Sequence, residues 1–162
     1  MIGRASALGC LLLVGSLGLP ADSHASHYRL GTVGLLYAKE VRQLSAAGIH
    51  TTKELLDGAA TSRQRARLAR KTKIKTLRIT LLATQCDLLR IDGVGPTMVR
   101  LFQASGYQHT ASLRRKTPQA VWKNLVAANQ VHRILPQPPA KALVGKWVRA
   151  AAASAVVLKG VK

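Results

Sequence analysis

Two glycines that enclose a single apolar residue are the feature of this chain with the clearest chemical use. Gly93 and Gly95 flank Val94, and Pro96 follows at once. Glycine tolerates a positive φ and lets a ligand approach the backbone closely, whereas proline suits the first position of a helix. The pattern therefore predicts a helix, a tight glycine turn and a second helix. Unpaired N–H groups at such a turn suit a phosphate oxygen, so we expect the amides of Gly93, Val94 and Gly95 to hold one.

The charge balance supports the same interpretation. The 162 residues include 25 Lys and Arg against 6 Asp and Glu, which gives a formal net charge of +19. Such a surface associates with DNA, RNA, anionic lipid or acidic polysaccharide, and charge alone does not choose among them. Together with a turn that suits phosphate, the charge points first to nucleic acid.

A basic tract begins just after a predicted helix start at Thr61 and contains no carboxylate. Arg63, Arg67 and Arg70 fall at positions i, i+4 and i+7, so they share one face of the predicted helix. Because no negative charge interleaves the tract, contact with a polyanion is favoured over a merely solvated face. The tract comprises Arg63, Arg65, Arg67, Arg70, Lys71, Lys73, Lys75 and Arg78.

The predicted nucleic-acid site combines the glycine turn with this tract. Arg90 and Arg100 flank the turn, where they add contacts to phosphate. The structural alternative is that the glycines make only a tight turn between packed helices. The predicted nucleic-acid-binding residues are Gly93, Val94, Gly95, Thr97, Arg100, Arg90, Arg63, Arg67, Arg70, Lys71 and Lys73.

Other chemistries find little support in the residue pattern. No histidine has a partner at ligand spacing, so we expect no metal site. Asp87 and Asp92 lie beside the turn without the residues that excision of a base requires. Nucleophile-elbow, phosphate-loop and metalloprotease motifs are absent from the sequence. We expect a non-enzymatic protein with no catalytic residue, no cofactor and no small-molecule substrate.

The N-terminus has the layout of a secretory signal peptide over residues 1–25. Arg4 precedes an uncharged, largely apolar run over residues 5–19, and Ser23-His24-Ala25 forms a small-residue cleavage site. We expect export to the periplasm or the exterior after cleavage near Ala25; an uncleaved anchor and a misassigned start are the alternatives. Cys86 is then the only mature cysteine, and its apolar neighbours predict a buried thiol.

Beyond the signal, caps and apolar spacing predict short helices and no strand, hence an all-α fold. The predicted helices cover residues 37–47, 51–57, 61–71, 75–90, 96–104, 110–115 and 117–129, with a last one after the prolines at 136–139. In the fourth, Leu77, Leu81, Cys86 and Leu88 are expected to form the buried face. Residues 44–55 recur loosely as 102–113, which indicates two related helical units. We assign 26–153 to one compact helical domain and 154–162 to a basic C-terminal tail.

The sequence also resembles a known family. AGIHTTKELL at residues 47–56, GAAT at 58–61 and IDGVGP at 91–96 are similar to a bacterial helix-hairpin-helix family, "domain of unknown function forty-three thirty-two". The resemblance runs from about Tyr28 to Ala151. It implies tandem helix-hairpin-helix units and no established enzymatic activity. Better-known proteins with such hairpins hold the DNA backbone without reading sequence, which implies phosphate contact for residues 93–95. In that pattern Lys is frequent where Thr97 stands, and a small Ala where Val99 stands.

These observations predict a non-catalytic, exported protein that binds the phosphate backbone of nucleic acid without sequence specificity. The alternative is a protein-interaction or scaffold module in which the hairpins are architecture and the positive charge serves an acidic partner. An anionic lipid or cell-wall surface is a third partner that the charge allows.

Overall fold

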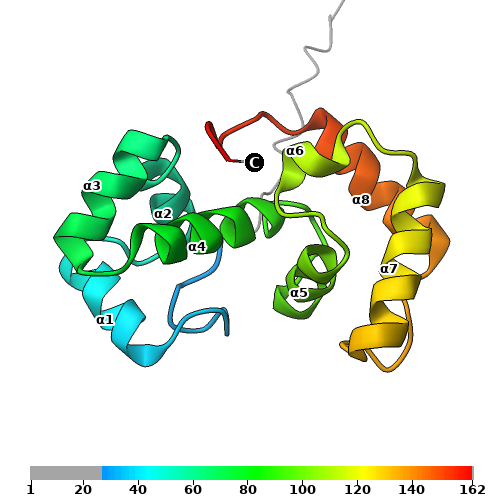
Figure 1. The fold of residues 1–162 in the computed structure, drawn as a ribbon, viewed down its shortest axis with the longest axis horizontal. Coiled ribbons are helices and arrows are strands. Elements are labelled where there is room, and N and C mark those ends of the chain that lie inside the picture. Colours follow the sequence, from blue (N-terminus) through cyan, green and yellow to red (C-terminus); the bar gives the residue numbers. More distant parts are fainter. Residues whose placement is uncertain (1–26, 162) are drawn as a thin grey trace, which may run out of the picture.

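The computed structural model describes residues 27–161, which form eight α-helices and no β-strand (Figure 1). The predicted all-α class is therefore confirmed. The predicted signal peptide, residues 1–25, lies outside the described range. The helices are α1 (Ala38–Ala46), α2 (Thr52–Gly58), α3 (Ser62–Thr72), α4 (Thr76–Leu88), α5 (Pro96–Ala104), α6 (Thr110–Leu113), α7 (Pro118–His132) and α8 (Lys141–Ala153).

Side-chain caps set several helix starts where the sequence predicts them. The Thr51 hydroxyl accepts from the amide of Glu54 in the first turn of α2, and the Thr61 hydroxyl accepts from the amide of Gln64 in the first turn of α3. Each cap satisfies a backbone donor that the first turn leaves unpaired. Pro96 opens α5 at the predicted residue. α6 ends at Leu113, earlier than predicted, whereas α7 continues past residue 129.

The eight helices form two successive units of four, α1–α4 and α5–α8, with the same order of turns. α1 and α5 each have nine residues, and each is followed by a glycine with positive φ, Gly48 at 82° and Gly106 at 85°. α3 and α7 both end at a cationic residue in the left-handed region, Lys73 and Arg133. Packing repeats as well, because α2 and α3 contact α4 as α6 and α7 contact α8. The two units therefore share the positions of these turns and the order of helix packing.

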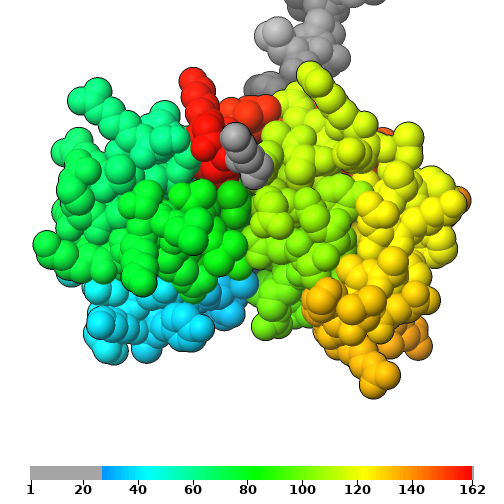
Figure 2. Space-filling view, in the orientation of Figure 1, coloured from blue at the N-terminus to red at the C-terminus, as the bar shows by residue number. Residues whose placement is uncertain are grey.

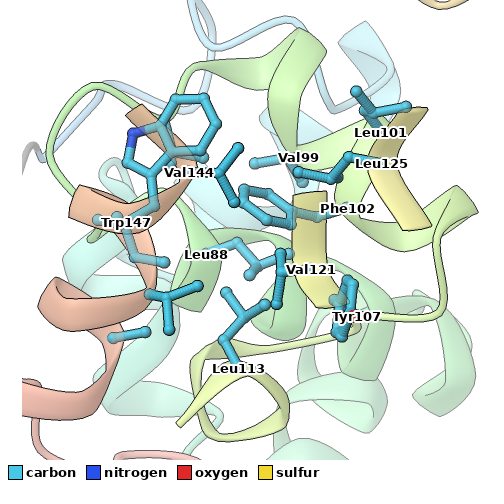
Figure 3. Close-up of a cluster of buried hydrophobic side chains, with 14 of the residues drawn as sticks. Leu88, Val99, Leu101, Phe102, Tyr107, Leu113, Val121, Leu125, Val144 and Trp147 are labelled. Atoms are coloured by element: carbon cyan, nitrogen blue, oxygen red, sulfur yellow. The ribbon is translucent and has the colours of Figure 1, made fainter. Parts of the chain in front are cut away.

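Each unit has its own hydrophobic core. In the second core the ring of Phe102 packs edge to face against Tyr107 and Trp147, with centroids 6.4 and 5.7 Å apart (Figure 3). The first core contains Cys86, which is 1% exposed. The predicted buried thiol is therefore confirmed, and burial raises its pKa to about 12.

The two chain ends of the described region cross between the cores. Val33, from the segment before α1, packs in the second core, while Leu158, from the segment after α8, packs in the first. The amide of Lys159 donates to the carbonyl of Ala60 at 2.8 Å. Residues 155–161, here called the C-terminal strap, run from α8 back toward α2 and α3 (Figures 1 and 2). The predicted basic tail is thus packed between the units over these residues.

The prediction of the buried face of α4 is partly wrong. Leu77 is 82% exposed and Leu81 is 36% exposed, whereas Cys86 and Leu88 are buried as predicted. α2 and α3 cover α4 on the side that carries Ile79, and this side does not include positions 77 and 81. The apolar spacing of the last helix also predicts a buried Leu143, but this side chain of α8 is 40% exposed.

An ion pair joins α1 to α4. Arg78 donates from Nε and Nη2 to the two carboxylate oxygens of Glu40, at 2.7 and 2.8 Å, and from Nη2 to the carbonyl of Leu35 at 3.0 Å. The hydrogen bonds from Arg78 hold the pKa of Glu40 below its ordinary value of 4.5. Arg78, a member of the predicted basic tract, is therefore neutralised within the fold.

Because of this ion pair, we expect the free energy of unfolding to decrease at acidic pH. Because the pKa of Glu40 is lowered by folding, its contribution is present above pH 4.5 and is lost as the pH falls through the folded-state pKa. We expect Glu40→Gln to cost about 1–3 kcal/mol of unfolding free energy at pH 7. Urea unfolding at pH 7 and in acid measures this; an equal loss at both pH values would contradict the assignment.

Candidate nucleic-acid interface

The glycine turn joins α4 of the first unit to α5 of the second. Gly93 adopts φ +75°, in the left-handed region that glycine reaches without strain. The amide of Val94 donates to the carbonyl of Ile91 at 3.0 Å and so closes the turn. The structure therefore has a helix, a tight glycine turn and a helix over this stretch, in the predicted order.

The Val94 bond corrects one detail of the predicted site. Because this amide donates within the turn, and because its side chain is 1% exposed in the second core, Val94 has no N–H to offer a ligand in this conformation. The amides of Gly93 and Gly95 donate to no acceptor among residues 27–161. Only two of the three predicted amides are thus available.

The first turn of α5 adds donors that the prediction did not assign to the backbone. No side chain caps this helix, and its first backbone bond runs from the Val99 amide to the Gly95 carbonyl at 3.0 Å. The amides of Thr97 and Met98 consequently have no partner in the described part of the chain. Four amides, at residues 93, 95, 97 and 98, lie at the positive end of the helix dipole.

Arg90 is committed to the fold. It donates from Nη1 to Oδ1 of Asp87 at 2.8 Å and to the carbonyl of Ala155 at 3.2 Å. The other oxygen of Asp87 accepts from the amide and the hydroxyl of Thr110, at 2.9 and 2.6 Å. Asp87 is 2% exposed. This cluster ties the end of α4 to the start of α6 and to the strap. Arg90, which the sequence predicts to contact phosphate, is instead paired with Asp87 in the fold.

Arg100 and Thr97 lie together on the first turns of α5. Arg100 is exposed, and its Nη2 donates to the Thr97 hydroxyl at 3.3 Å. No carboxylate in the described residues pairs with Arg100. Of the two cations predicted beside the glycine turn, Arg90 and Arg100, Arg100 is the one without a carboxylate partner among the described residues.

The predicted cations of α3 lie elsewhere. Arg63, Arg67, Arg70, Lys71 and Lys73 are exposed, and Lys71 donates to the carbonyl of Ala47 at 2.9 Å. The 13 residues of α4 separate the end of this group from the glycine turn, a distance of about 20 Å. The structure therefore places the two halves of the predicted site at opposite ends of α4 (Figure 1).

Arg65 does not belong to this surface. It is 2% exposed, and its guanidinium donates to backbone carbonyls of Ala59, Lys159 and Gly160. Desolvation lowers its pKa. Sequence reasoning treated it as one more exposed cation, because the strap that buries it is distant along the chain.

A charge asymmetry escaped the sequence analysis although the sequence contains it. Residues 93–162 include eleven Lys or Arg and no Asp or Glu. The second unit therefore has no side-chain carboxylate to neutralise its cations. Among residues 27–161, no three His, Cys, Asp or Glu side chains are grouped to hold a metal ion. None of the described helices has the length and apolar character to cross a membrane.

These features define an all-α protein of two four-helix units joined through a glycine turn. The family described as "Domain of unknown function (DUF4332)" matches residues 35–154, so the chain belongs to this family. The match spans both units and confirms the family that the sequence resembles. No curated protein and no solved structure matches the chain.

Proposed function

We propose that this protein binds nucleic acid without catalysis, by holding backbone phosphates at the α4–α5 turn irrespective of base sequence. The observation that carries the proposal is the uncapped start of α5 behind exposed Gly93. Backbone amides at a helix N-terminus suit a phosphate oxygen in both geometry and charge. Such contacts position a duplex and carry no sequence information.

The distribution of charge supports this proposal. Arg100 lies beside the turn, and the second unit has no side-chain carboxylate that would repel a polyanion. The α3 cations, Arg63, Arg67 and Arg70, extend the positive potential along the first unit, where they attract a polyanion at longer range. In this proposal the glycine turn binds a backbone phosphate, and the more distant cations attract the polyanion.

Salt dependence tests the proposal directly. For about four phosphate contacts, affinity for a short DNA duplex falls about a hundredfold between 50 and 200 mM salt. We expect this decline in a gel-shift series, with the same affinity for a duplex of scrambled sequence. Absence of binding at low salt, or binding that salt leaves unchanged, would contradict the proposal.

A charge-matched pair of variants locates the contact. Arg100→Gln removes a cation beside the turn and should weaken binding severalfold while reducing the salt slope by about one. Lys123→Gln removes the same charge from the exposed side of α7 and should change binding little. Equal effects of the two variants would mean that only net charge matters.

We also propose that the mature protein is exported after removal of residues 1–25. The support is the predicted signal peptide, which no described residue bears on. N-terminal sequencing of the protein recovered outside the cytoplasm should begin at Ser26. Recovery of the whole chain from the cytoplasm would contradict export and leave the binding proposal unchanged.

A further inference from the structure

We infer that the indole N–H of Trp147 is an additional donor to the oxyanion that the α4–α5 turn binds; this rests on the proposed function and adds a residue to its site. Trp147 is 2% exposed, and its Nε1 has no acceptor among the described residues. A buried donor without an acceptor destabilises the folded state. Such a group in a native fold requires an explanation.

The unpartnered nitrogen lies against the glycine turn. A Cβ atom placed on Gly93 would stand 3.4 Å from Nε1 of Trp147 and would meet no other residue within 4 Å beyond its chain neighbours. Because residue 93 is glycine, no side-chain atom separates the turn from the indole N–H. Figure 3 shows this nitrogen on the edge of the ring that is turned away from Phe102. The indole ring of Trp147 packs in the second core, and its N–H lies beside the glycine turn.

The other tryptophan, the partly buried Trp122, has an acceptor for its indole N–H. Nε1 of Trp122 donates to the carbonyl of Pro139 at 3.1 Å. The fold satisfies that donor from its own backbone. For Nε1 of Trp147, beside Gly93, the described backbone supplies no acceptor, although the same unit has carbonyl groups at the ends of α5 to α8.

The donors around the turn specify the class of ligand. Indole nitrogen is a donor only, and the neighbouring amides of Gly95, Thr97 and Met98 are donors too. A group that accepts from all of them needs several oxygens on one centre, which a phosphodiester or free phosphate has. Because Nε1 is buried, the turn shifts slightly as an oxygen enters, and the conformational freedom of Gly93 permits that shift.

Nuclear magnetic resonance of the indole N–H groups tests this on the unaltered full chain. The protein contains two Trp residues, so two indole signals are expected, and Trp122→Phe assigns them. Titration with a short DNA duplex should move the Trp147 proton signal downfield as a hydrogen bond to oxygen forms. The Trp122 signal, already hydrogen-bonded to Pro139, should stay in place as an internal reference.

A variant measures the contribution of the donor. Trp147→Phe keeps an aromatic ring in the core and removes the N–H; we expect duplex affinity to fall about tenfold, as for a hydrogen bond to a charged group. Trp122→Phe, which removes the other indole N–H, should bind DNA as the wild type does. Affinity of Trp147→Phe equal to that of the wild type, with an unmoved Trp147 signal, would overturn the inference.

The outcomes separate this inference from the proposed function. DNA binding with an unmoved Trp147 signal overturns the inference and leaves the proposed function in place. A Trp147 signal that moves with inorganic phosphate, in a protein that does not bind DNA, supports the oxyanion site and rejects nucleic acid as its ligand. If neither DNA nor phosphate moves the signal, the inference is wrong whatever the fate of Trp147→Phe during folding.

Discussion

Asp87→Ala should lower the free energy of unfolding by about 3–5 kcal/mol, because it removes the carboxylate partner of the partly buried Arg90 and leaves two buried donors of Thr110 without their acceptor. The carboxylate is 2% exposed and accepts from Arg90 and from both donors of Thr110. These contacts join the end of α4 to the start of α6. Unfolding in urea, followed by circular dichroism, measures the loss.

The neighbouring carboxylate provides the control. Asp92 lies on the glycine turn, five residues along, and is exposed. Asp92→Ala should change stability by less than about 0.5 kcal/mol, although it removes the same charge. A small loss for Asp87→Ala, comparable to that for Asp92→Ala, would contradict the structural role assigned to Asp87.

Helix boundaries were predictable because neighbouring residues determine them. The Thr51 and Thr61 caps, the proline that opens α5 and the glycine after it all act within a few residues. The internal repeat was visible for the same reason, since each unit repeats local turns. Local chemistry therefore fixed the order of elements before any long-range contact was known.

The buried face of α4 was not predictable from spacing alone. Apolar residues surround most of this helix, from Leu77 through Ile79 to Leu82. Periodicity selects a face only when polar residues mark the opposite one. The packing of α2 and α3 against α4 determines which face of α4 is buried, and this packing is a tertiary property.

The candidate site was predicted in part, and its errors come from hydrogen bonds, local and long-range, that the fold makes. The glycine turn stands where the sequence places it, but hydrogen bonds engage the Val94 amide, the Arg90 side chain and the Arg65 side chain. The first partner of Val94 and of Arg90 lies three residues away, and it is the geometry of the turn that selects it. The Lys159 partner of Arg65 lies far along the chain and cannot be recognised from residue type. The contact between Trp147 and Gly93 escaped prediction for the same reason, since α8 reaches the turn only in the folded protein.

Arg65→Met should release the C-terminal strap and cost about 3–4 kcal/mol of unfolding free energy. The guanidinium has no carboxylate partner among the described residues. It instead donates to carbonyls on both sides of the contact, Ala59 at 3.0 Å and Lys159 and Gly160 at 2.9 and 3.0 Å. Methionine fills much of the same volume but donates nothing, so several buried acceptors lose their partner at once.

Hydrogen exchange distinguishes release of the strap from general destabilisation. The Lys159 amide, which donates to Ala60 at 2.8 Å, should lose its protection in Arg65→Met while amides within α4 keep theirs under native conditions. Arg67→Met, an equal change at an exposed position two residues along α3, should leave both stability and protection nearly unchanged. Uniform loss of protection in Arg65→Met would contradict specific release of the strap. It would show instead that the buried guanidinium stabilises the whole first unit.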